Sequence, residues 1–359
     1  MKQFIILTCL FILIADTAQS QGCIMIRNIS GFGQYNLTDN SFSTSSWQLN
    51  INNRYYIASR DFKGTTDLKL SEGDRTFIRS FATDISATKF LNNGWSMNLS
   101  LPFSVNSRST NKDHGGPGTA RHTTRSFGLG DIRFTVYKWL LNPSVSQKIN
   151  VQLGLGIKLP TGDNTYEDYF YKNDSTRILA PVNASIALGD GGTGIITEIN
   201  TFYVLNKTIS FYGNFYYLMN PRDQGGASTT TWKTPTALEL KTTAAVYSVP
   251  DLYSVRAGLY INFAKVSLSA GFRDEAVPFS DLFGGVNGRR RPGYNLSFEP
   301  GIIYKIKNSS IYVYLPVTVA RKIKQDITDA RASEITGEFK MLPGTTGDYS
   351  IFVGALFRL

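Results

Sequence analysis

The 359-residue chain contains two histidines, His114 and His122, in one polar stretch. Asp113 precedes His114, and an imidazole oriented by a carboxylate can activate water or a hydroxyl. No recognisable hydrolase motif surrounds them, and neighbours in sequence need not face each other. We therefore expect no catalytic residues and keep a membrane-embedded hydrolase using His114 or His122 as the least favoured alternative. Because no cysteine and no ordered acidic spacing accompanies the two histidines, we expect no metal site and no cofactor.

A glycine-rich run, GDGGTG at 189–194, is the second candidate for chemistry. Such runs bind phosphate or calcium in other proteins. This one lacks the Lys-Ser/Thr of a phosphate loop and is not repeated as calcium loops are. We expect a tight periplasmic turn.

Ten charged residues share one feature: each falls on the polar side of a segment that alternates polar and apolar residues. They are Asp131, Arg133, Lys158, Glu198, Glu239, Lys241, Arg256, Arg273, Glu299 and Arg358. If the apolar side meets lipid, these side chains face a lumen. They would form either a charged constriction that orients a solute or a paired network that stabilises the interior, and we favour the network. Six cations against four anions argue against strong ion selectivity.

A basic cluster, Arg289, Arg290 and Arg291, falls in a predicted long loop. Other long loops contribute further basic residues, namely Arg121, Arg125, Lys322 and Lys324. These loops would contact anionic lipopolysaccharide or an anionic solute, or they are ordinary solvated charges. The sequence leaves both open.

The segment 126–163 shows which elements must position these residues. From Ile149 to Leu159 apolar residues occupy every second position, with Gly154 and Gly156 on the polar side. This period of two predicts a strand with one apolar and one polar face, ending at Pro160. It pairs with the preceding segment as a hairpin. The run 95–106 after Asn-Gly shows the same alternation.

Similar segments recur along the chain, and they predict an all-β fold: an antiparallel transmembrane β-barrel of about 14 strands, with a range of 12–16. Two of the expected strands are 177–189 and 237–249. Little helix is expected. Long loops are expected at 59–74, 107–125, 160–176, 220–236, 275–292 and 322–347. The loop 220–236 breaks the alternation of long and short connections, so the strand count stays open.

The N-terminal region is divided by composition. Residues 1–20 read as a secretory signal peptide, 21–44 as a lead-in or small plug, and 45–359 as the barrel. Cys23 would be the one cysteine left after cleavage, either an ordinary thiol or a lipidated terminus. The alternation from Tyr349 to Leu359 predicts a closing strand, which resembles the signal that the barrel insertion machinery recognises.

Composition agrees with a barrel. Charged residues make up 18%, aromatic residues make up 13%, and the mean hydropathy is −0.14. A transmembrane barrel alternates polar and apolar residues, so its average hydropathy lies near zero. The net charge of +10 is not clustered on one segment, so we expect no nucleic-acid partner. The expected partners are outer-membrane lipid, lipopolysaccharide, the insertion machinery and an unidentified small solute. Trp47, Trp95 and Trp139 are expected at the membrane interfaces.

The segments SFGLGDIRFTVYKWLL and LGLGIKLPTGD resemble the hallmark of the MetA-pathway phenol-degradation family of bacterial outer-membrane transporters, in particular its Bacteroidetes-type members. The similarity is weaker through LGDGGTGI at 188–195 and GRRRPGYNLSFEPG at 288–301. It implies an outer-membrane barrel that passes small hydrophobic or aromatic compounds.

Together, the alternation and the resemblance predict a non-enzymatic, porin-like channel or transporter in the outer membrane of a Gram-negative bacterium. The alternative is a sealed structural or surface-binding barrel.

Overall fold

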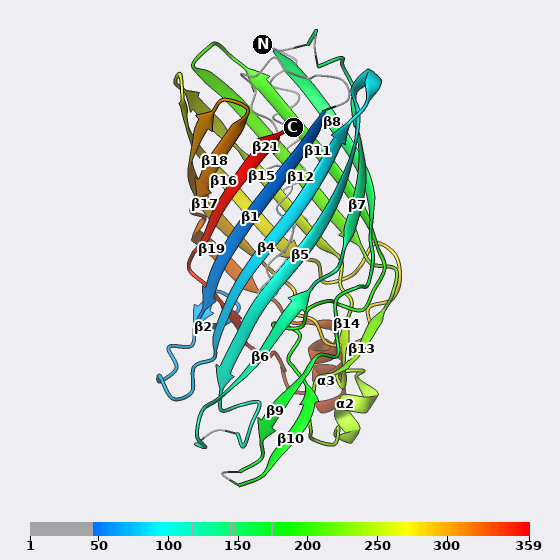
Figure 1. Cartoon of the computed structure of the whole chain (residues 1–359). Helices are drawn as coiled ribbons and strands as arrows, with labels where there is room; N and C mark the ends of the chain where they lie inside the picture. Colours follow the sequence, from blue (N-terminus) through cyan, green and yellow to red (C-terminus); the bar gives the residue numbers. More distant parts are fainter. Residues whose placement is uncertain (1–45, 117, 144, 147, 174) are drawn as a thin grey trace.

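The computed structural model describes residues 46–359 except 117, 144, 147 and 174, so the expected signal peptide and lead-in lie outside the described residues. The described chain forms a closed antiparallel barrel whose main sheet contains 14 strand segments (Figure 1). The segments are β1 (Trp47–Ala58), β4 (Phe77–Phe90), β5 (Trp95–Thr110), β6 (His122–Leu129), β7 (Arg133–Trp139), β8 (Ile149–Lys158), β11 (Gly194–Val204), β12 (Ile209–Met219), β15 (Leu252–Asn262), β16 (Val266–Val277), β17 (Gly293–Ile306), β18 (Ser309–Tyr314), β19 (Val317–Ile323) and β21 (Ser350–Arg358).

The barrel closes through two pairings. β21 lies between β1 and β18, so the last strand joins the first. β16 pairs with β17 over its whole length. β6 and β7 share the edge of β5, and β18 and β19 share the edge of β17, so the 14 segments occupy 12 positions around the wall. Closure leaves the sheet without a free end, as lipid requires, while β6 and β19 each form a ladder with a single strand.

Short connections gather at one end of the barrel and long ones at the other (Figure 1). The short ones include the β4–β5 turn η1 (Asn92–Gly94) and 205–208, 263–265 and 307–308. The long ones are 59–76, 111–121, 159–193, 220–251, 278–292 and 324–349. Long and short connections therefore alternate without exception around the described wall, as in outer-membrane barrels.

This alternation corrects two expected wall strands. Residues 177–189 contribute only β10 (Arg177–Pro181), which pairs with β9 (Glu167–Tyr171) outside the wall. Residues 237–249 form α2 (Ala237–Lys241) and β14 (Val246–Ser248), and β14 pairs with β13 (Gln224–Ser228). Removing these two strands restores the alternation that the loop 220–236 disturbed. The run 189–194 lies at the long-loop end, so a periplasmic turn there was wrong.

The long connections build a loop layer over one end of the barrel. It also contains β2 (Arg60–Lys63), β3 (Thr66–Asp67), α3 (Ile327–Thr336) and β20 (Gly344–Thr346). α3 begins where the Asp326 side chain accepts a hydrogen bond from the Asp329 N–H at 2.6 Å, and it ends at Gly337 with φ 71°. The expectation of little helix is confirmed. Among the described residues no helix is long and apolar enough to span a membrane.

Side chains alternate between the two faces of the wall. On β5, Leu99, Phe103 and Val105 are exposed, whereas Ser96, Asn98 and Ser104 are buried in the interior. Trp47 and Trp95 point outward, but Trp139 is 3% exposed and faces inward, so its assignment to an interface belt was wrong. The outer face is thus apolar for lipid, and the inner face is polar.

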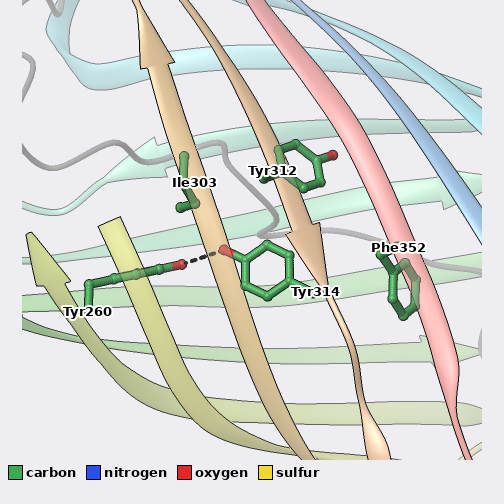
Figure 2. Packing of buried hydrophobic residues seen from close by; sticks show 5 residues of the cluster. All are labelled: Tyr260, Ile303, Tyr312, Tyr314 and Phe352. Atoms are coloured by element: carbon green, nitrogen blue, oxygen red, sulfur yellow. Dashed lines mark hydrogen bonds between the residues drawn. The ribbon is translucent and has the colours of Figure 1, made fainter. Parts of the chain in front are cut away.

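Part of the interior is filled by aromatic side chains. Tyr260, Tyr312, Tyr314 and Phe352 pack with Ile303 on the inner face of β15, β17, β18 and β21 (Figure 2). The Tyr260 and Tyr314 hydroxyls are hydrogen-bonded at 3.1 Å, as Figure 2 shows. This side of the lumen is therefore solidly packed.

Candidate functional site

Six of the ten charged residues expected in the lumen are buried on inward-facing strand positions, each no more than 8% exposed. They are Arg133, Lys158, Glu198, Arg256, Arg273 and Glu299. They fall into groups with different surroundings, and two of these groups organise the interior.

We call the first group the β15–β17 cluster; it consists of Arg256, Arg273, Glu275 and Glu299. The Arg256 and Arg273 Nε atoms donate to Glu299 at 3.0 and 2.7 Å. Arg273 also reaches Glu275 at 2.9 Å. The Arg256 guanidinium lies 5.6 Å from the ring centre of Tyr314. Two cations and two anions neutralise each other, so this cluster supports the wall without presenting net charge to the lumen.

Glu198 stands apart from that cluster. Its carboxylate accepts hydrogen bonds from the Tyr137 hydroxyl at 2.8 Å and from the Asn214 and Asn200 amides at 3.1 and 3.2 Å. These neutral donors satisfy a buried carboxylate and fix the polar side chains of β7, β11 and β12 against one another.

The second group is centred on Asp131, in the break between β6 and β7, and we call it the Asp131 junction. The Asp131 carboxylate accepts hydrogen bonds from the backbone N–H groups of Gly162 at 3.0 Å and Asp190 at 3.3 Å. Lys158 Nζ lies 3.6 Å from Asp131 and is ion-paired with Asp190. Three segments far apart in the sequence, 126–131, 158–163 and 188–190, therefore meet at one point.

Glycines allow the segments of the junction to approach one another this closely. A Cβ on Gly162 would lie 2.6 Å from the Leu188 carbonyl oxygen, and one on Gly189 would lie 2.5 Å from the Gly162 carbonyl oxygen. Backbone atoms cannot give way as a flexible side chain can, so only glycine fits at the crossing. Thr161 Oγ1 completes the contact by donating to the Gly130 carbonyl at 2.8 Å. The same motifs that resemble the transporter family thus build the junction.

The junction holds an inward-folded segment, residues 182–190. Val182 and Ile186 pack against Tyr56, Ala58 and Ile78 on the inner faces of β1 and β4. The Asn106 amide and the Ser126 hydroxyl donate to the Ile186 carbonyl. This segment therefore enters the mouth of the barrel and narrows it.

A cavity of about 110 Å³ lies between the inward-folded segment and the wall. Apolar side chains form one part of its lining, including Pro102, Leu188, Leu218, Tyr247 and Leu252. Charged side chains form another part: the ion pair Arg133–Asp84 and the Asp131 junction. An apolar chamber with a few fixed polar groups is the usual form of a small-molecule site.

Two cavity residues were missed by sequence reasoning. Asp84, the partner of Arg133, is 6% exposed and lies on an inward position of β4, so the alternation of 76–90 contains its signal. Asp190 lies in the glycine-rich run, and no local pattern indicates that this run returns to Lys158.

Several expected site residues lie elsewhere. Glu239 and Lys241 belong to α2 in the loop layer, so their placement in the lumen was wrong. Arg358 is half-buried at the end of β21, where its backbone N–H donates to the Asn308 carbonyl at 3.0 Å. Arg290 lies in a loop as expected, but its side chain is buried and forms two 2.7 Å hydrogen bonds to Asp281.

The histidines form no oriented acid–base pair. Asp113 binds Arg108 at 2.6 Å instead of His114. His114 is 1% exposed, and its Nδ1 accepts the Tyr171 N–H at 3.0 Å. Burial lowers the pKa of His114 to about 4. His122 stacks on Tyr171 with ring centres 3.9 Å apart. Both rings therefore pack the loop layer. Among the described residues no group of three His, Cys, Asp or Glu side chains could hold a metal ion.

Comparison with known proteins supports the fold. No family model and no curated protein matches the sequence. The crystal structure of the COG4313 outer membrane channel from Pseudomonas putida F1 is similar, with a TM-score of 0.60, 11% identity and coverage of 88% of this chain and 96% of that chain. The translocator domain of autotransporter NalP from Neisseria meningitidis gives a TM-score of 0.46 at 10% identity, covering 89% and 90% of the two chains.

The chain therefore has the fold of an outer-membrane β-barrel, which confirms the predicted fold class. The expected resemblance to the phenol-degradation family is supported only in part: the fold is similar to that of an outer-membrane channel.

Proposed function

We propose that this barrel is a channel for small apolar or aromatic molecules, which pass the cavity between the inward-folded segment 182–190 and the wall. The observation that carries the proposal is the cavity itself. It lies inside a lipid-facing barrel and combines apolar lining with charges held at fixed points. The similar COG4313 protein is described as an outer membrane channel, which agrees with this function.

The size of the cavity favours a small solute. An apolar protein cavity of about 150 Å³ accepts benzene. The cavity here, about 110 Å³, is of the same order. A modest movement of segment 182–190 would then admit a single aromatic ring. Larger solutes would require the segment to leave the mouth of the barrel.

The charges at the cavity favour weak ion selectivity. Arg133 and Lys158 supply two cations, and Asp84, Asp131 and Asp190 supply three anions. Because these groups are paired, they orient polar parts of a solute without generating a strong field of one sign.

Liposome swelling with the refolded protein tests the proposal. Toluene-sized aromatic alcohols, amino acids and sugars are the test solutes, and heat-modifiable migration verifies insertion. Uptake of the aromatic solutes ahead of sugars of similar mass is expected. Inserted protein that passes no solute would refute a channel.

A sealed structural barrel is the second candidate. The aromatic packing around Tyr260, Tyr312, Tyr314 and Phe352 favours it, because this packing fills one side of the lumen. The same swelling experiment separates the two functions, since a sealed barrel inserts equally well and passes nothing.

The remaining partners are proposals of a more general kind. Lipid surrounds the apolar face, and the closing strand β21 is the element that the barrel insertion machinery would recognise. The signal peptide at 1–20 stays a prediction.

A further inference from the structure

A second cavity lies in the loop layer and is lined by four arginines: Arg108, Arg289, Arg290 and Arg291. Its volume is about 80 Å³, and none of the described residues lining it is acidic. One water needs only about 10–15 Å³ by this measure, so a group the size of a carboxylate fits.

Three of the four guanidinium groups have carboxylate partners outside the cavity lining. Arg108 pairs with Asp113 at 2.6 Å, Arg289 with Asp329 at 3.5 Å and Arg290 with Asp281 at 2.7 Å. Arg291 forms no ion pair with any described residue; its Nη1 donates to the Arg290 carbonyl at 3.3 Å. The four guanidinium groups thus have three carboxylate ion-pair partners among the described residues, and a fourth carboxylate, Asp326, accepts the Arg290 backbone N–H at 3.3 Å.

The lining also contains buried polar atoms that have no hydrogen-bond partner among the described residues. They are Ser185 Oγ, Ser248 Oγ and Arg290 Nε. Each of them can donate a hydrogen bond. Unpaired buried donors are costly, and here three of them belong to residues that line a cavity with four arginines and no acidic side chain. An anion with several acceptor oxygens would satisfy this combination.

This cavity adjoins the lumen cavity. Ala184, Tyr247, Ser248 and Pro250 line both. The Asn183 amide donates to the Tyr247 hydroxyl at 2.8 Å, which ties the inward-folded segment to β14 between the two spaces. A ligand that is held at the arginines and reaches the apolar chamber must therefore pass these shared residues.

We propose that the arginine-lined cavity binds the carboxylate of a small amphipathic acid, whose apolar body points into the lumen cavity. The inference rests on the proposed function and names its substrate class as aromatic or short aliphatic monocarboxylates. Arg291 provides the charge, Ser185 and Ser248 provide neutral hydrogen bonds, and Arg108, Arg289 and Arg290 hold their positions through their aspartate partners.

The charge distribution fixes the direction of such a ligand. The lumen cavity is lined by three anions and two cations, whereas the other cavity is lined by four arginines and no acidic residue. A carboxylate is therefore attracted to the arginines and repelled from the Asp131 junction. The uncharged end of the molecule faces the chamber.

The test compares two ligands of equal shape, benzoate and benzamide, by calorimetric titration of the full barrel in detergent. Benzoate should bind at least about tenfold more tightly, because it gains charge-assisted hydrogen bonds. Arg291→Gln should remove this difference, and Arg291→Lys should keep part of it. Arg125→Gln, which removes an exposed arginine charge on β6, is the matched control and should change nothing.

Equal binding of benzoate and benzamide by the unmodified protein would overturn the site. An equal loss of the benzoate preference in Arg125→Gln would also overturn the site, because the preference would then depend on the overall charge of the protein. Heat-modifiable migration verifies that each variant is folded. Lipopolysaccharide micelles that bind at Arg291 and are not displaced by benzoate would assign the cavity to lipid phosphates and refute the proposed carboxylate.

Swelling assays on the same variants separate this inference from the proposed function. Passage of benzyl alcohol without any benzoate preference would leave the channel intact and remove the anion site. Tight benzoate binding with no passage of any solute would keep the site and refute the channel.

Discussion

The lumen contains two groups of buried charges that differ in what holds them. In the β15–β17 cluster, side chains from neighbouring strands pair directly with one another, and Arg256, Arg273 and Glu299 are each no more than 2% exposed. At the Asp131 junction, the carboxylate is held by backbone N–H groups from the two ends of the connection 159–193 as well as by Lys158. The first group belongs to the wall, and the second ties the connection 159–193 to the wall.

Because of this difference, we expect the β15–β17 cluster to keep the wall rigid and the Asp131 junction to control the access of solutes to the lumen cavity. The β15–β17 cluster is surrounded by tyrosines, and none of its residues lines the lumen cavity. Residues of the Asp131 junction line that cavity and anchor the segment that narrows it. Changes in the first group should act on stability, whereas changes in the second should act on the passage of solutes.

The largest effect is expected for Glu299→Gln. It leaves two buried arginines with Glu275 as their remaining carboxylate in the cluster, and breaking such a buried pair costs about 3–5 kcal/mol. The free energy of unfolding, followed in urea by the loss of heat-modifiable migration in lipid vesicles, should fall by that amount. Uptake per folded molecule should stay unchanged.

Glu275→Gln is the matched control, because Arg273 then retains Glu299 at 2.7 Å. A smaller loss is expected for this variant. If both variants unfold at the same urea concentration as the unmodified barrel, the cluster contributes nothing to the wall.

Gly162→Ala tests the crossing at the junction. The added Cβ would meet the Leu188 carbonyl oxygen at 2.6 Å, so the two ends of the connection 159–193 must separate. Such overpacking costs about 1–3 kcal/mol. We expect a lower free energy of unfolding together with faster uptake of aromatic solutes. Gly73→Ala, whose Cβ would have only Ser71 Oγ within reach at 3.8 Å, should behave as the unmodified protein. Slower uptake in Gly162→Ala would contradict the assigned role of the crossing.

Asp190→Asn weakens the same junction more gently. Lys158 keeps Asp131 at 3.6 Å, and Asp190 is partly exposed, so the stability should fall by about 1 kcal/mol or less. Segment 182–190 should detach more often and solute uptake should rise. Glu338→Gln removes a carboxylate from an exposed ion pair and serves as the control. Equal uptake in both variants would show that the Lys158–Asp190 pair does not hold the segment.

The wall could be predicted from the sequence because each strand contains its own period of two. β5 and β8 show this, and the side of the wall for Arg133 and Lys158 follows from the same period. The partners Asp84 and Asp190 could not be assigned, because a contact between strands or loops depends on the register and on the path of the loops. A local pattern contains neither of these.

The wrong placement of Glu239 and Lys241 has a local cause. Residues 238–241 alternate apolar and polar residues over a stretch too short to distinguish a strand from a helix. Thr236 and Glu239 form a capping box, a sequence signal for the start of a helix. The interrupted alternation of long and short loops at 220–236 was a second signal. Together, the capping box and the loop lengths would have given a barrel of 12 strands.

His114 in the loop layer gives the mildest and most selective test of the contrast between wall and loops. Burial lowers its pKa from the ordinary 6.5 to about 4, so folding favours the neutral ring, although Asp113 favours the charged one. The stability from this group is complete above pH 6.5 and is lost as the pH falls through about 4.

Protonation of His114 would oppose the hydrogen bond that its Nδ1 accepts from the Tyr171 N–H. Protease cleavage within the loop 111–121 should therefore increase between pH 6.5 and 4 while the wall stays intact. In His114→Gln this increase should be absent, and an unchanged pH profile would show that protonation of other groups loosens the loops.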